Sequence, residues 1–200
     1  MRWLAIGTIA FASILIVVLG LRISELDGRL VETRRRLSLP HPGYSVPTFE
    51  TSDLQGEPVT IGETIEGGKQ IILVFGTDCP FIRASLPAWK RLAALVDTFE
   101  TYPVDLHAIS LGTEDETRAY AAENGLSMSV VRFPEPKLAQ LYRAAVIPQT
   151  LVLDSRGGVL HARTGVLDVG PALDSIVELL SRRMPSAGAG TQTIPPRRHP

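Results

Sequence analysis

The sequence holds only one cysteine, Cys79, among its 200 residues. An internal disulfide is therefore impossible, so cysteine counting says nothing about the redox compartment in which the chain works. An excess of basic residues is also missing, because 20 lysines and arginines stand against 21 acidic residues and the formal net charge is -1. This balance removes the usual reason to expect a nucleic-acid partner.

The common cofactor and metal motifs are missing as well. No Gly-x-Gly-x-x-Gly or Gly-x-x-x-x-Gly-Lys loop follows an apolar strand, and no Gly-x-Ser-x-Gly segment is present. The histidines are scattered without metal-ligand spacing, and His107 lies in an apolar strand where a core histidine is the simpler interpretation. We therefore expect no metal and no cofactor. The four histidines are His41, His107, His161 and His199.

A long apolar run stands at the N-terminus. Trp3 to Leu21 carries no charged side chain, and as a helix it would be about 28 Å long, the thickness of a bilayer core. A cleaved signal peptide is the alternative. It is disfavoured because the run is long and only Arg2 precedes it. The run predicts a transmembrane anchor over residues 1–22.

Flexible segments are predicted on both sides of a globular domain. Residues 23–43 read as a polar stalk or linker, which Pro40 and Pro42 end. Residues 184–200 are rich in Ala, Gly and Pro and predict a disordered tail. Several arginines follow the apolar run, and a literal positive-inside count would place the domain in the cytoplasm.

Strands and helices alternate over residues 44–183. This order predicts an α/β fold, a central mixed sheet with helices on both faces. Strands are expected at 48–51, 59–61, 71–75, 104–110, 128–133, 150–153 and 159–163, and helices at 85–99, 114–123, 135–143 and from 171 onward.

Cys79 follows the apolar strand Ile71–Phe75 and precedes a helical pattern. A thiol on the first turn of a helix meets unpaired backbone N–H groups and the positive end of the helix dipole, which favour the thiolate, the nucleophilic form. The alternative is an ordinary buried cysteine that fills the core. We expect Cys79 to be the working residue.

Two blocks of sequence carry a family resemblance. Val74–Pro87 resembles the active-site segment F-W-A-T-W-C-P-P-C-R-x-E-x-P of TlpA/ResA-type redoxins, which are membrane-anchored, thioredoxin-like thiol–disulfide oxidoreductases. Val146–Asp154 resembles their segment G-V-P-x-T-F-x-I-D, and Gly165 follows at the expected place. The first block keeps Thr77, Cys79, Pro80, Arg83 and Pro87.

The resemblance implies a thioredoxin-like fold. Pro148 would be a cis-proline that faces Cys79, and the backbone of Ile147 would bind an extended substrate. Thr77, Pro80 and Arg83 would support the thiol. The partner would be a thiol or disulfide of another protein, or a low-molecular-weight thiol. The family also implies a domain outside the cytoplasm, in a periplasm or its equivalent, against the arginine count.

The chain departs from the family pattern at two positions. Ile82 replaces the second cysteine, whose thiolate would release the substrate from a mixed disulfide. Asp78 replaces the tryptophan before Cys79, and its negative charge disfavours a neighbouring thiolate, an effect that Arg83 opposes. Phe81 and Ile82 are candidates for an apolar docking patch, although Ile82 can equally pack beneath the helix.

Three functions remain open from the sequence. In the first, Cys79 forms a mixed disulfide or a sulfenic acid that an external thiol resolves. Alternatively, the chain is a single-cysteine peroxidase, although Gly76 stands where peroxiredoxins carry a threonine. The third possibility is a redox-inactive binding or assembly module that keeps the fold.

Overall fold

The computed structural model describes residues 19, 21–22, 38–96, 98–99 and 103–182. The chain divides into two compact units, Met1–Leu39 and Pro40–Pro200. Most of the predicted anchor and stalk, and the whole predicted tail, lie outside the described residues. Within the part of the chain that is described, no helix is long and apolar enough to cross a membrane.

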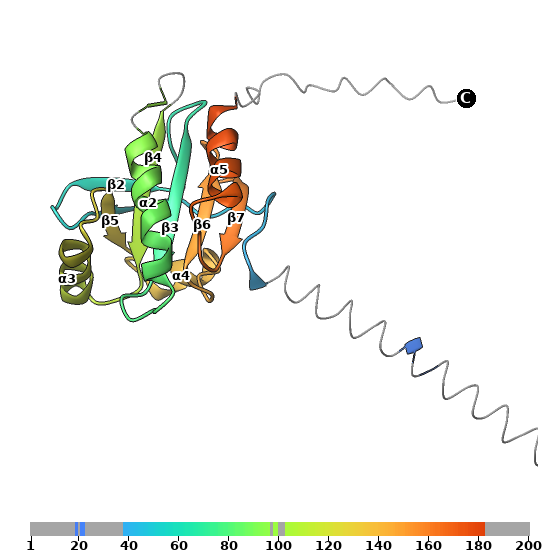
Figure 1. Cartoon of the computed structure of the whole chain (residues 1–200), viewed down its shortest axis with the longest axis horizontal. Coiled ribbons are helices and arrows are strands. Elements are labelled where there is room, and N and C mark those ends of the chain that lie inside the picture. The colour runs from blue at the N-terminus through green and yellow to red at the C-terminus, as the bar shows by residue number, and fades with distance from the viewer. Residues whose placement is uncertain (1–18, 20, 23–37, 97, 100–102, 183–200) are drawn as a thin grey trace, which may run out of the picture. The chain divides into compact units, whose positions relative to one another are not determined.

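A five-stranded mixed sheet forms the centre of the second unit, with the strand order β5-β4-β3-β6-β7 (Figure 1). The strands β3, β4 and β5 run parallel to one another, whereas β6 is antiparallel to both β3 and β7. The strands are β3 (Lys69–Phe75), β4 (Val104–Ser110), β5 (Ser129–Arg132), β6 (Gln149–Leu153) and β7 (Val159–Thr164).

The strand β3 is buried along its whole length, since both faces of the sheet are covered. Successive side chains of a strand point to opposite faces, and β3 divides accordingly: Ile71, Leu73 and Phe75 join one core cluster and Ile72 and Val74 the other. This explains the unbroken apolar run in the sequence, which is typical of parallel strands buried on both sides.

Different elements cover the two faces of the sheet. One core cluster takes side chains from the helices α2 (Ile82–Val96), α3 (Glu114–Asn124) and α5 (Pro171–Ser181). The other is covered by the antiparallel hairpin of β1 (Phe49–Ser52) and β2 (Pro58–Ile61) and by the region of the short helix α4 (Pro136–Leu141). Helices on both faces are therefore found, but a hairpin makes up much of the second layer.

The helix that follows Cys79 begins earlier than predicted. It starts at Ile82 instead of Ser85 and ends at Val96. Pro87 lies in its second turn, and the apolar side of the helix still faces the core through Ala88, Trp89 and Leu92. The extra turn at the start sets where Cys79 lies relative to the helix.

Candidate active site around Cys79

Three segments that are distant in sequence meet at one edge of the sheet. The carboxyl ends of β3 and β4 lie side by side because the two strands are parallel, with Phe75 opposite Ser110. The amino end of β6 lies at the same edge because β6 is antiparallel to β3, with Gln149 opposite Val74. The segments that hold Cys79, Gly112 and Ile147 therefore come together there.

Cys79 lies in a tight turn between β3 and α2. Its backbone N–H donates to the carbonyl of Gly76 at 3.1 Å, and its own carbonyl accepts from the N–H of Ile82 at 3.2 Å. The expectation that Cys79 lies on the first turn of the helix is therefore wrong, since it stands three residues before Ile82. The thiol is half-buried, so it is reachable from solvent without being part of the open surface.

The opposite wall of the site is the loop before β6. The Ile147–Pro148 peptide bond is cis, as the motif predicts. The thiol of Cys79 donates to the carbonyl oxygen of Ile147 over 3.9 Å, a long contact for a weak sulfur donor. The loop is held on its other side, because the N–H of Gly165 donates to the carbonyl of Pro148 at 2.7 Å.

Glycine is needed at position 165 for this contact. Its φ of +90° lies in the left-handed region, and an added Cβ would meet no atom within 4 Å. Backbone conformation is therefore the constraint on this residue, which only glycine adopts at low cost. Gly165, which follows the second motif block, thus has a physical role: it fixes the carbonyl of Pro148, directly after the cis bond.

A cavity of about 500 Å³ opens beside the thiol. Its apolar wall is formed by Leu111 and Ile147, and its polar wall by two hydroxyl and two carboxylate side chains. The polar side chains are Thr77, Asp78, Thr113 and Glu116. No group of three or more His, Cys, Asp or Glu side chains in the described residues is placed to hold a metal ion.

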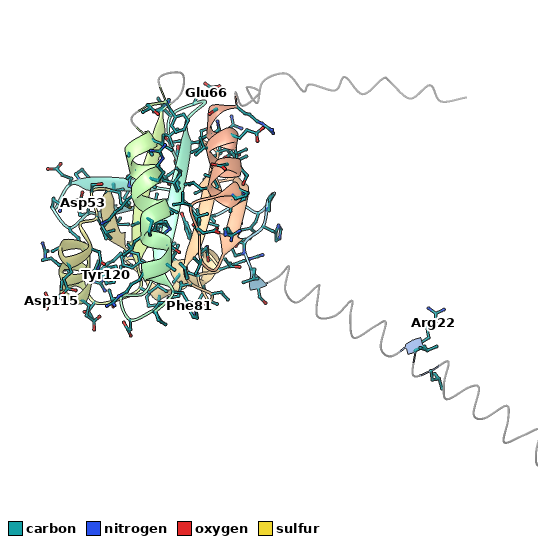
Figure 2. All side chains as sticks on the ribbon, viewed as in Figure 1. Arg22, Asp53, Glu66, Phe81, Asp115 and Tyr120 are labelled. Carbon is teal, nitrogen blue, oxygen red and sulfur yellow. The ribbon has the colours of Figure 1, made fainter. Side chains whose placement is uncertain are left out.

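The remaining predicted site residues divide into exposed and buried groups. Pro80 and Arg83 are exposed near the start of α2, and Phe81 is 61% exposed. Ile82 has no exposed surface and belongs to the core cluster of α2 and β3. The prediction that Ile82 contacts a substrate is therefore wrong; its side chain packs beneath the helix (Figure 2 labels the neighbouring Phe81).

Thr113 on the loop after β4 and Glu116 in the first turn of α3 also line the cavity and were not predicted. Thr113 caps α3 through a reciprocal arrangement, in which its hydroxyl accepts from the N–H of Glu116 while the Glu116 carboxylate accepts from the N–H of Thr113 at 2.8 Å. These hydrogen bonds lower the pKa of Glu116, so it is charged at neutral pH. The pattern Thr-x-x-Glu after a strand is a capping signal that would have placed both residues at this edge.

Tyr120 of α3 is a further neighbour that the sequence did not reveal. Its hydroxyl is buried and has no hydrogen-bond partner among the described residues. Burial raises the pKa of Tyr120; the Arg83 charge lowers it, and the charge of Cys79 raises it further. Its ring lies 5.5 Å from that of Phe75, centroid to centroid, so α3 packs directly behind the turn that carries the thiol.

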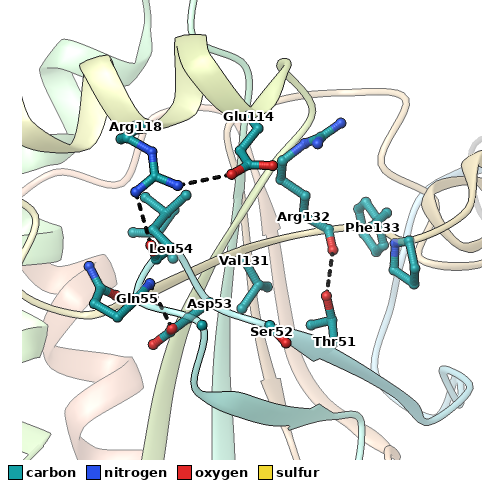
Figure 3. A pocket seen from close by; sticks show the side chains of 13 residues that line it. Thr51, Ser52, Asp53, Leu54, Gln55, Glu114, Arg118, Val131, Arg132 and Phe133 are labelled. Carbon is teal, nitrogen blue, oxygen red and sulfur yellow. Dashed lines mark hydrogen bonds and ion pairs between the residues drawn. The ribbon is translucent and has the colours of Figure 1, made fainter.

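A second cavity, of about 600 Å³, lies between the hairpin, β5 and α3 (Figure 3). Its Arg118 donates to the carbonyl of Leu54 and forms an ion pair with Glu114 at 2.9 Å. Arg132 donates to the carbonyl of Gly112 at 2.9 Å. This cavity shares no lining residue with the thiol cavity, and no cysteine is among its lining residues, so thiol chemistry belongs to the site around Cys79.

The sheet order, the turn that carries a thiol and the cis-proline opposite it define a thioredoxin-like protein. The chain belongs to the AhpC/TSA family, whose sequence profile matches residues 42–162. Together with the structural neighbours described below, this confirms the assignment to the thioredoxin-like redoxins that the two sequence blocks suggested.

Curated relatives share about a quarter of their residues with the chain. The methylamine utilization protein MauD of Methylophilus methylotrophus is 27% identical over 142 residues, which cover 70% of this chain and 63% of that protein. MauD of Paracoccus denitrificans is 27% identical over 176 residues, or 85% of this chain and 83% of that protein. The chain thus spans less than two thirds of the Methylophilus relative.

Solved structures of thioredoxin-like proteins superimpose on the domain. The thioredoxin domain of a thiol-disulfide oxidoreductase from Bacteroides vulgatus matches with a TM-score of 0.59 at 16% identity, covering 72% of this chain and 99% of that one. StoA from Bacillus subtilis matches with a TM-score of 0.55 at 19% identity, covering 68% and 97%. At these identities the likeness shows the fold.

Proposed function

We propose that the chain is a monothiol exchange protein in which Cys79 forms a mixed disulfide by attacking a partner disulfide, and an external thiol then resolves it. The observation that carries this proposal is the half-buried thiol, which lies in a cavity with its Sγ 3.9 Å from the carbonyl of Ile147, next to the cis-proline. A buried filler cysteine would have neither a cavity nor a backbone wall beside it.

The exchange balances without a second cysteine in the chain. The thiolate of Cys79 attacks one sulfur of a partner disulfide, the partner's S–S bond breaks and its other sulfur leaves as a thiolate. Because Ile82 carries no thiol, an external thiolate then attacks the mixed disulfide. This second step returns the Cys79 thiolate and leaves the two outside sulfurs joined.

Peroxide reduction is the second candidate, supported by the family profile and by the general oxidation of thiolates to sulfenic acids. One feature of the site favours exchange instead. Peroxiredoxins carry a threonine at the position of Gly76, and a Cβ there would come within 2.8 Å of the Cδ1 atom of Ile147. A third candidate, a binding module, needs no thiol at all.

The test uses the full-length chain and its Cys79→Ser variant, which differ by one atom at the site. Capture of a labelled disulfide and consumption of hydrogen peroxide are both measured, and circular dichroism verifies folding. We expect covalent capture that depends on Cys79. Peroxide consumption without capture would overturn the proposal in favour of the peroxidase, and the absence of both in a folded chain would favour the binding module.

We further propose that residues 1–22 anchor the chain in a membrane with the domain outside the cytoplasm. The support is the uncharged apolar run of Trp3 to Leu21 and the family pattern of the two motif blocks. Protease treatment of sealed spheroplasts and carbonate extraction of their membranes test both statements. We expect digestion of the domain from outside and retention of the N-terminal segment in the membrane; protection of the domain, or release by carbonate, would contradict them.

A further inference from the structure

The thiol cavity carries negative charge and no positive charge on its lining. Asp78 and Glu116 line it together with Cys79, and no lysine or arginine is among the lining residues. The two carboxylates come from different elements, the turn after β3 and the first turn of α3. They are close enough for Asp78 to raise the pKa of Glu116, although the hydrogen bonds from Thr113 dominate and keep Glu116 ionised.

The nearest basic side chains are directed elsewhere. Arg132 lines the other cavity and donates to the backbone carbonyl of Gly112. Arg118 is paired with Glu114. Arg83 is exposed at the start of α2 and acts on Tyr120 without lining the cavity. The charged side chains on the lining of the thiol cavity, apart from Cys79 itself, are therefore the two carboxylates.

We propose that Asp78 and Glu116 select positively charged disulfides as the partners of Cys79. This inference rests on the proposed exchange reaction and names the class of its substrate: a disulfide with an amine or guanidine group next to the reacting sulfur. Carboxylates attract such a group and repel an acidic one, and both carboxylates line the cavity in which the thiol lies. Discrimination then comes from attraction and repulsion together.

The reaction itself is unchanged by this selection. The Cys79 thiolate attacks the sulfur next to the cationic group, the S–S bond breaks and the departing half leaves as a thiolate. Any change in the intrinsic reactivity of Cys79 affects its attack on every disulfide alike. The ratio between disulfides of different charge therefore isolates the contribution of the cavity.

The experiment measures the rate of mixed-disulfide formation on the full-length chain by intact mass. Three small disulfides serve as probes: cystamine, which is cationic, hydroxyethyl disulfide, which is neutral, and dithiodipropionate, which is anionic. Each rate is divided by the rate at which a free thiolate attacks the same probe. A matched pair of peptide disulfides, with lysine or glutamate beside the cysteine, distinguishes a protein partner from a small amine.

We expect cystamine to react about tenfold faster than dithiodipropionate after this correction, a ratio at the lower end of the range for electrostatic steering. The ratio should fall towards one in the double variant Asp78→Asn/Glu116→Gln, and also at high salt. Glutamine at position 116 can still accept the capping hydrogen bond of α3. The matched control is Glu123→Gln/Asp174→Asn, which changes net charge equally at exposed helix positions and should keep the ratio.

The outcomes distinguish a failure of the charge selection from a failure of the exchange reaction. Equal corrected rates for the three small probes and for both peptides, or a ratio that survives the double variant, would overturn the charge selection while leaving the exchange reaction in place. A chain that captures none of the probes would overturn the proposed function itself. A preference confined to the lysine peptide would retain charge selection and assign the cation to a protein partner.

Discussion

At the scale of single residues, position 82 decides what the thiol can do. In a C-x-x-C protein this position holds the second cysteine, whereas here Ile82 is fully buried and forms part of the core between α2 and β3. The side chain adds to stability and removes the internal route for releasing a substrate. In the proposed exchange, a thiol from outside the chain therefore resolves the mixed disulfide at Cys79.

Restoring a thiol at this position should change an intermolecular reaction into an intramolecular one. The N–H of Ile82 donates to the carbonyl of Cys79, a turn that keeps the two Cα atoms within about 7 Å, compatible with a disulfide. We expect Ile82→Cys to close this bond when the chain is treated with diamide, which intact mass reveals as the loss of two hydrogens.

The same substitution should cost stability, because a buried side chain becomes smaller. We expect the reduced Ile82→Cys variant to lose about 1–3 kcal/mol of unfolding free energy, as for other buried truncations, measured by urea denaturation. Ile82→Ala is the matched control, which loses more and forms no internal disulfide. A reduced Ile82→Cys variant as stable as the parent would contradict the packing of Ile82, and failure to form the bond would contradict the geometry of the turn.

At the scale of elements, the sequence revealed the order of strands and helices because apolar periodicity reflects burial. The boundaries of α2 were less predictable, since Pro87 and the polar residues before it suggested a later start than Ile82. The thiol cavity was predicted only in part. Cys79 and Ile147 were named from the motif blocks, but Glu116 was not, because placing it needs the capping signal after β4 to be combined with the parallel pairing of β3 and β4.

The end of α3 offers a test of one boundary that the sequence did predict. Gly125 follows the helix with φ 57° and ψ 52°, and its N–H donates to the carbonyls of Ala121 and Ala122. An added Cβ would meet only the Lys90 Nζ atom, at 3.9 Å. We expect Gly125→Ala to lower the unfolding free energy by about 1 kcal/mol or slightly more, because a left-handed backbone penalises a Cβ.

The control for this change is Gly125→Asn, which adds a larger side chain yet tolerates the left-handed region better. Denaturation with urea should rank the parent first, the asparagine variant second and the alanine variant last. If alanine proved no worse than asparagine, the cost would come from side-chain size instead of backbone conformation, and the assigned cap geometry would be in error.

At the scale of the whole molecule, two histidines are partly buried at a cost that depends on pH. Burial lowers the pKa of His107 in β4, although Asp105 and Asp53 oppose the effect. Burial and the nearby Arg163 lower the pKa of His161 in β7. The buried Nδ1 atom of His107 and Nε2 atom of His161 have no hydrogen-bond partner within the described residues. Neither buried nitrogen therefore has an acceptor that would stabilise a protonated ring.

The lowered pKa values of the two histidines determine how the stability changes with pH. Below about pH 6.5, the ordinary pKa of histidine, the unfolded chain binds protons that the folded chain refuses, so the free energy of unfolding falls as the pH falls. Above that pH both states are neutral at these residues and the contribution is constant. Each histidine adds a slope of at most about 1.4 kcal/mol per pH unit, with the larger share from the more deeply buried His107.

The prediction is that His107→Gln flattens this slope. Urea denaturation of the parent, His107→Gln and His161→Gln chains at pH 7.5, 6.5 and 5.5 (about one pH unit apart, spanning the histidine range) measures it, above the range in which most carboxylates titrate. We expect the parent to lose stability between the second and third conditions and His107→Gln to lose distinctly less, with His161→Gln in between, because His161 is closer to solvent and more strongly screened. Parallel curves for all three chains would show that neither imidazole is held neutral by the fold.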